Sequence, residues 1–208
     1  MTTSLLRELQ DDRTRLMPLT VRQYHQMIAA GIVPEGEPYE LLDGQLLRKD
    51  RSATGEDPMT VSHQHAWAVK ALARLGTKFE PLGCHVQTQQ PITLPPHQEP
   101  EPDGAVIAGS EEDYRDRHPG PRDVLCVVEV ADASLRRDRT TKLRIYASAG
   151  IGTYLIVNLR DRCVEVHTGP IRRSGRYRDV KVLAVADAIA FPAPAGKVLE
   201  LPVRRLFA

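Results

Sequence analysis

The chain has 208 residues, of which 41% are hydrophobic and 26% charged, so it fits one globular domain with a buried core. Its net charge of +1 argues against a general binder of polyanions. The charge is uneven, however: Lys and Arg number 12 against 18 Asp and Glu in residues 1–120, and 16 against 9 in residues 121–208. This asymmetry is typical either of a basic face for an acidic partner or of mutual neutralisation within the fold.

The cysteines and the N-terminal sequence further restrict the class of protein. Cys84, Cys126 and Cys163 are widely spaced and odd in number, which supports neither a disulfide framework nor a zinc cluster and suits a reducing cytoplasm. The first residues, "MTTSLLRELQDDRTRL", mix acids and bases where a signal peptide needs an apolar run. No stretch approaches the ~20 apolar residues of a membrane span. We expect an N-terminal extension over residues 1–17 and a single domain over 18–208.

The first elements in chain order are two helices with a hairpin between them. Thr20 and Gln23 form the pattern of a capping box that opens a helix over 21–30, and Gly31 is placed to end it. "YELLDGQLL" predicts two short strands around the turn at Asp43 and Gly44. A longer helix is predicted after Ser62, and its apolar positions keep helical spacing: Ala68, Leu72, Leu75 and Phe79.

The rest of the chain is dominated by strand patterns. They are "HVQTQQPITL", "DGAVIA", "DVLCVVEV", "GTYLIVNL", "CVEVHTG" and "DVKVLAVA". A helix, "RTTKLRIYASAG", separates the third of these strands from the fourth, and a strand–helix–strand unit of this kind lets the two strands pair in parallel. The pattern therefore predicts an α/β (α+β) chain.

Three acidic residues fall at strand positions. Glu129 lies inside the most apolar strand, Asp103 follows Pro102 where another strand begins, and Glu40 opens the hairpin. An Asp and a Glu from adjacent strands, completed by water and phosphate, form a typical site for Mg²⁺. Each acid also has an ordinary structural interpretation: Asp103 as a turn residue, Glu129 as the partner of an arginine, and Glu40 as an exposed strand residue.

Longer motifs favour the metal site. The segments "YELLDG" (39–44), "PDGAVI" (102–107), "VVEVADASLRRDRTTKLRIYASAGI" (127–151) and "TYLIVNL" (153–159), together with His65, resemble the PD-(D/E)XK nuclease superfamily. Within it they are similar to the Uma-two-type "putative restriction endonucleases", over about residues 18 to 170. The resemblance implies a restriction-endonuclease-like mixed central sheet flanked by helices, a divalent metal, Mg²⁺ or Mn²⁺, and hydrolysis of phosphodiester bonds.

The resemblance also implies roles for individual residues. Asp103 and Glu129 match the two metal ligands of the motif, and Glu40 matches an upstream acid that would be an additional ligand. The simple motif has a lysine two residues after the glutamate, where this chain has Ala131. Lys142, on the following helix, is placed as the catalytic substitute that reaches back to the site.

Further side chains are candidates for contacts with the substrate. Arg136, Arg137 and Arg139 follow the glutamate closely and suit phosphate oxygens, although solvated arginines explain them equally well. His65 is a candidate for lining the site. Gln87 is a candidate for orienting a water, against the commoner role of an ordinary strand glutamine.

These observations predict a metal-dependent endonuclease that acts on DNA. If Ala131 means that the lysine is lost, the chain is instead a non-catalytic nucleic-acid-binding or interaction protein with a nuclease-like fold. A hydrolase that uses two carboxylates on sugars is the weaker alternative, because aromatic residues make up only 5% of the chain. A homodimer is expected by analogy with nucleases that cut both strands, and no membrane partner is expected.

Overall fold

A computed structural model describes residues 16–34, 36–48 and 62–207. Its centre is a mixed six-stranded sheet with the strand order β3-β4-β5-β6-β7-β8. The strands are β3 (Cys84–Gln87), β4 (Gly104–Ala108), β5 (Val124–Ala131), β6 (Thr153–Asn158), β7 (Cys163–Ile171) and β8 (Arg176–Leu183). β5 and β6 pair in parallel and the other neighbours pair antiparallel. The predicted mixed sheet and its parallel pair are therefore confirmed.

The connection between β5 and β6 is a continuous helical segment. It comprises α5 (Leu135–Arg137), the π-helical turn η3 (Asp138–Lys142) and α6 (Leu143–Ala149). Gly150 ends the segment with a φ of 85°, a left-handed conformation that glycine adopts without strain. The predicted helix is confirmed, and it begins four residues earlier than the sequence pattern indicated.

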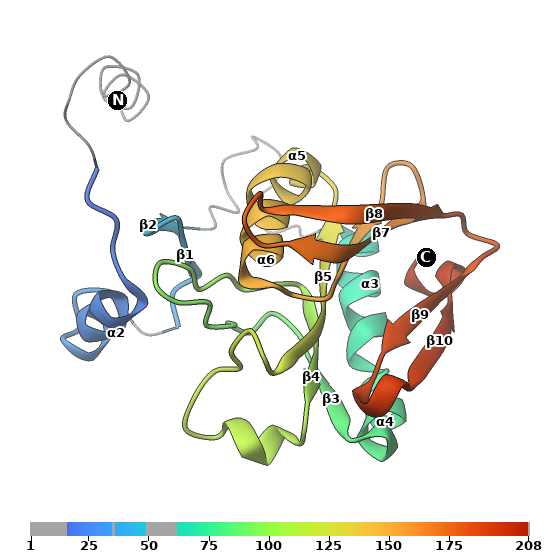
Figure 1. Cartoon of the computed structure of the whole chain (residues 1–208), viewed down its shortest axis with the longest axis horizontal. Helices are drawn as coiled ribbons and strands as arrows, with labels where there is room; N and C mark the ends of the chain where they lie inside the picture. The colour runs from blue at the N-terminus through green and yellow to red at the C-terminus, as the bar shows by residue number, and fades with distance from the viewer. Residues whose placement is uncertain (1–15, 35, 49–61, 208) are drawn as a thin grey trace.

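Side chains that alternate along β5 and β6 supply the two faces of the sheet. Val128, Val130, Leu155 and Val157 form one core with α3 (His63–Ala73), α4 (Gly76–Phe79) and the C-terminal region. Val127, Ala131, Tyr154 and Ile156 form the other core with α6. Figure 1 shows α3 on one side of β5, and α5 and α6 on the other. Glu129 alternates with Val128 and Val130, so it shares the α6 side with Val127 and Ala131.

The N-terminal part is joined to the sheet through the segment that leads into β4. It contains α2 (Val21–Ala29) and the hairpin of β1 (Tyr39–Leu42) and β2 (Gln45–Arg48). The capping box of Thr20 and Gln23 is present, and Asp43 and Gly44 form the turn with φ of 53° and 71°. Leu41 and Glu99 exchange two backbone hydrogen bonds of 3.2 and 2.7 Å. His25 Nε2 lies 2.8 Å from Glu99 Oε1, so α2 is held to the same segment.

The structure differs from the sequence predictions at three further places. The helix after Ser62 ends at Ala73, Leu75 lies in the break that follows, and Phe79 ends the separate α4, because Gly76 is a poor helix former. The strand predicted over 85–94 ends at Gln87, since Gln89 has a φ of 52°. Two unpredicted strands, β9 (Ala188–Pro192) and β10 (Val198–Pro202), form a C-terminal hairpin.

Short helices complete the fold. They are η1 (Glu80–Leu82), η2 (Glu111–Tyr114), η4 (Pro194–Gly196) and η5 (Val203–Leu206). Within the described ranges, no helix has both the length and the apolar character needed to cross a membrane. Most of the predicted N-terminal extension, residues 1–15, lies outside the described residues.

Candidate active site

The register of β4 against β5 brings Asp103 and Glu129 together. Gly104, the first residue of β4, pairs with Val128, so Asp103 continues the antiparallel register opposite Glu129. Asp103 is held there because its Oδ2 accepts a 2.8 Å hydrogen bond from the Val130 backbone N–H. Two acids predicted from distant sequence motifs are therefore neighbours, as adjacent strands require.

Lys142 reaches into the same place from η3. Its Nζ lies 2.8 Å from Glu129 Oε1 and 2.9 Å from Glu40 Oε1, and only 2% of the residue is exposed. Burial by itself would lower the pKa of Lys142, but the two glutamates outweigh burial and raise it. The lysine therefore carries a buried positive charge between two carboxylates.

Glu40 is delivered by the hairpin. Glu40 lies on β1 beside Leu41, the residue that exchanges backbone hydrogen bonds with Glu99. The Oε1 atom of Glu40 also accepts a 2.9 Å hydrogen bond from the Glu101 backbone N–H. The side chain is fully buried. Docking of the hairpin beside the segment 99–103 thus brings Glu40 to Lys142, which lies far away in the sequence.

Glu129 combines two buried hydrogen bonds with a strongly raised pKa. Its Oε1 accepts hydrogen bonds from Lys142 and, at 2.7 Å, from the hydroxyl of Tyr146 on α6. Burial is the main cause that raises the pKa of Glu129 to about 8; the nearby charges of Asp138, Asp103 and Glu40 act in the same direction, and Lys142 opposes them. One lysine does not balance the acids around it, so the cluster favours additional positive charge.

His65, at the start of α3, faces Asp103 from the other side. Its Nε2 lies 3.2 Å from Asp103 Oδ2, and its Nδ1 is buried with no hydrogen-bond partner among the described residues. Burial would raise the pKa of Asp103, but interaction with His65, the Val130 N–H and Lys142 lowers it overall. Asp103 is therefore the acid of the pair that ionises readily.

The donor atoms fit a divalent cation held by two carboxylates. In residues 16–34, 36–48 and 62–207, no three His, Cys, Asp or Glu side chains are arranged to hold a metal ion by themselves. In that same part of the chain, the hydrogen bonds and ion pairs of these two acids fall on Asp103 Oδ2 and Glu129 Oε1, which leaves Asp103 Oδ1 and Glu129 Oε2 without a donor. Mg²⁺ commonly takes one or two carboxylates and completes its shell with water and phosphate. Glu40 as a further ligand stays a prediction, since its Oε1 is bound to Lys142.

Two residues around the site were not assigned by the sequence interpretation. Tyr146 lay in the quoted motif without a role, and its hydroxyl binds Glu129. Asp138 is buried at 1% exposure, accepts a 2.6 Å hydrogen bond from Ser134 Oγ, and has a pKa raised chiefly by burial. The sequence signal that could have identified Asp138 is its spacing from Lys142, since residues four apart on a helix lie on one face.

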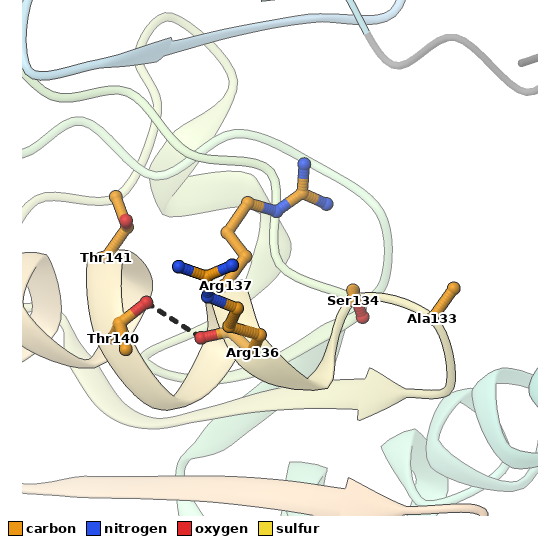
Figure 2. A pocket seen from close by; sticks show the side chains of 6 residues that line it. All are labelled: Ala133, Ser134, Arg136, Arg137, Thr140 and Thr141. Atoms are coloured by element: carbon orange, nitrogen blue, oxygen red, sulfur yellow. Dashed lines mark hydrogen bonds between the residues drawn. The ribbon is translucent and has the colours of Figure 1, made fainter.

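The predicted arginines separate into two groups. Arg136 and Arg137 line a surface pocket of about 610 Å³ with Ala133, Ser134, Thr140 and Thr141 (Figure 2). Arg139 instead binds Glu165 on β7 through Nε at 3.0 Å and Nη2 at 2.6 Å. The structure thus places Arg136 and Arg137 beside open space and Arg139 in an ion pair.

The pocket and the buried cluster are carried by one helical segment. Asp138 and Lys142 are buried, whereas Arg136, Arg137 and Thr140 are exposed. Gln87, on β3, donates a 3.3 Å hydrogen bond to the Pro91 carbonyl, and among the described residues it makes no hydrogen bond to the buried acids or to Lys142. The pocket lined by Arg136 and Arg137 therefore lies on the surface of the same helical segment that carries the buried Asp138 and Lys142.

Comparisons with known proteins give a matching family model and a solved structure of similar fold. The model of the Uma2 family, described as "Putative restriction endonuclease", matches residues 21–204. A solved structure described as a putative nuclease belonging to DUF820, from Anabaena variabilis ATCC 29413, superposes with a TM-score of 0.64 at 14% identity. The superposition covers 91% of this chain and 98% of that one, which shows a shared fold. No curated protein matches the chain.

Proposed function

Since this chain belongs to the Uma2 family, we propose that it is an endonuclease that hydrolyses phosphodiester bonds of DNA with the help of Mg²⁺ or Mn²⁺. The observation that supports the proposal best is the ammonium of Lys142, buried between Glu129 and Glu40 beside the paired Asp103. Apolar cores rarely contain such a group unless it is paired, and here three acids surround it. The arrangement suits a reaction in which negative charge builds up on phosphate.

Asp103 and Glu129 would hold the cation through Asp103 Oδ1 and Glu129 Oε2. A cation held there would supply a Lewis acid for a phosphate oxygen and would lower the pKa of a bound water. Glu129 Oε1 remains occupied by Lys142 and Tyr146, which fix the orientation of the carboxylate. Tyr146 is thereby a positioning residue, and Lys142 supplies the positive charge beside the attacking water or the phosphate.

Arg136 and Arg137 would bind the DNA backbone. Their guanidinium groups border the pocket of Figure 2. Neither makes an ion pair with a described residue. Phosphate contacts of this kind position a nucleic acid without reading its sequence. His65 contacts Asp103, so its proposed role is to orient that carboxylate and not to contact the substrate directly.

The proposal is tested by incubating plasmid and single-stranded DNA with the protein in Mg²⁺, in Mn²⁺ and in EDTA. We expect cleavage with either metal, none in EDTA, and loss of cleavage in Asp103→Asn and in Glu129→Gln. Glu165→Gln is the matched control, because Glu165 is also a buried glutamate of the sheet but pairs with Arg139 outside the cluster. This control should retain cleavage.

Metal binding is measured separately by thermal shift. Mg²⁺ should raise the melting temperature of the wild type and of Glu165→Gln, and should leave that of the Asp103→Asn/Glu129→Gln double variant unchanged. Equal stabilisation of the double variant would reject these two residues as the ligands. DNA binding without cleavage under all metal conditions would favour the non-catalytic alternative.

A further inference from the structure

The two edges of the central sheet differ in length and exposure. β3, at one edge, has four residues, of which Cys84 and His85 are buried. β8, at the other edge, has eight residues, and the five residues from Arg178 to Val182 are all exposed. Figure 1 shows β8 at the outer border of the sheet beside β7. An exposed edge of this length is a template for pairing with another strand.

The exposed part of β8 is regular and has free backbone groups. Its pairing with β7 runs without interruption from Asp179↔Thr168 to Leu183↔Val164. Among the described residues, no backbone hydrogen bond joins β8 to any segment other than β7. Val180 and Val182 are 57% and 61% exposed, and they are two of the larger exposed apolar side chains of the chain. The edge therefore combines unpaired backbone with exposed apolar surface.

The charges on this edge are complementary to themselves. Asp179 and Lys181 flank Val180, and neither makes an ion pair with another described residue. In an antiparallel pair of identical strands related by a two-fold axis through Val180, Asp179 lies opposite Lys181 of the second copy, and Lys181 lies opposite Asp179. Opposite charges that face each other across strands stabilise the pairing.

Neighbouring registers lack this match. A two-fold axis through Asp179 places two aspartates opposite each other, and an axis through Lys181 places two lysines opposite each other. An axis through Val180 also places Val180 against its own copy, and brings Val182 against the aliphatic part of Arg178. Of these three registers, only the one centred on Val180 avoids like charges and covers the exposed valines.

We infer that the β8 edge is a homodimer interface, formed by antiparallel pairing of two copies about Val180. The occupant of the edge is a second copy of this chain. Lysine and aspartate on a strand edge can also serve to prevent association, and that role requires no particular partner residue. Charge substitutions at positions 179 and 181 distinguish pairing from prevention of association. Only in a paired dimer does the effect of a substitution at one position depend on the charge at the other position in the second copy.

The test uses two single charge changes, Asp179→Lys and Lys181→Asp. In each homodimer the paired residues would have the same charge twice, so we expect each variant to dimerise about tenfold more weakly than the wild type or worse. In a mixture of the two variants, however, both cross-strand pairs are again opposite in charge. The mixture should therefore form a heterodimer at concentrations at which each variant alone is monomeric.

Sedimentation velocity from micromolar to near-millimolar concentrations measures these equilibria, without metal or DNA, so the result is independent of the proposed nuclease activity. Lys197→Asp, an exposed charge change outside β8, is the control and should dimerise like the wild type. Unchanged melting temperatures establish that the variants are folded. A wild type that stays monomeric throughout, or variants that show no preference for the heterodimer, would overturn the inference.

Discussion

Lys142 Nζ lies 2.8 Å from Glu129 Oε1, although the two residues are carried by different elements, the turn η3 and the strand β5. Ala131 lies two residues after Glu129 on the same side of the strand and is fully buried. Its methyl group occupies the position at which the simple nuclease motif carries lysine. The ammonium group therefore reaches the glutamate from the covering helix, and the small side chain of Ala131 makes this approach compatible with close packing.

Whether Lys142 supplies the catalytic ammonium group can be tested by moving the lysine to position 131. Lys142→Ala should reduce cleavage about a hundredfold or more, because a preorganised positive charge is removed from the site. Adding Ala131→Lys should restore part of the activity, since the truncated Lys142 leaves room for the new side chain. Initial rates of plasmid cleavage measure both effects, and the Mg²⁺-induced thermal shift checks that metal binding remains. Wild-type rates in Lys142→Ala would assign this lysine a structural role alone.

Removal of the Tyr146 hydroxyl should affect both stability and activity. Tyr146→Phe loses a buried hydrogen bond to Glu129, so we expect the free energy of unfolding to fall by about 1.5–3 kcal/mol and cleavage to slow. Tyr177→Phe is the matched control, because this buried hydroxyl donates to the Ile151 carbonyl at 2.9 Å. The control should lose about 1 kcal/mol in urea unfolding and keep its cleavage rate. Equal cleavage by the two variants would contradict the positioning role of Tyr146.

The arginines should differ in their effect on the salt dependence of DNA binding. Arg136→Ala and Arg137→Ala should each lower the slope of log affinity against log salt concentration by about one unit, as expected for one lost phosphate contact. Arg139→Ala should keep the slope and lower the stability, because it leaves the buried Glu165 without its arginine. Fluorescence anisotropy over a salt series gives the slopes. A reduced slope for Arg139→Ala alone would assign the phosphate contact to that residue.

We expect His167 to make the free energy of unfolding depend on pH. It is 5% exposed, stacks on Tyr154, lies near Tyr177, and has no hydrogen-bond partner for either ring nitrogen among the described residues. Burial lowers the pKa of His167, and Arg139 lowers it further, while Glu165, 3.6 Å away, opposes the shift. The neutral imidazole is therefore the form that the folded protein favours.

The direction of the pH effect follows from this lowered pKa. Between the folded pKa and the ordinary value near 6.5, the unfolded chain binds more protons than the folded chain. The contribution of His167 is thus complete above about pH 6.5, and it is lost as the pH falls from that value toward the folded pKa. His167→Phe should flatten the dependence of the unfolding free energy on pH in this window, measured by urea unfolding. His118→Phe, at an exposed histidine, should leave it as in the wild type.

Local sequence patterns determined the elements whose signals are themselves local. The capping box at Thr20, the left-handed turn at Asp43 and Gly44, and the strand–helix–strand unit of β5, α6 and β6 all depend on residues close together in the chain. Patterns of this kind are read directly because backbone sterics and hydrogen bonding act within a few residues. The proximity of Asp103 and Glu129 is not local in this sense: the family resemblance implied it, and it depends on the pairing of β4 with β5.

Tertiary structure alone decided which charged side chains meet. Glu40 reaches Lys142 only because the hairpin docks on the segment 99–103. Arg139 pairs with Glu165 on β7, which separates it from Arg136 and Arg137. Likewise, β8 becomes an exposed edge only through its place in the sheet order. A buried charged side chain requires a partner of opposite charge, but the sequence offers several acids or bases that could be that partner. The packing of distant elements selects among them, since it alone determines which pairs lie within hydrogen-bonding distance.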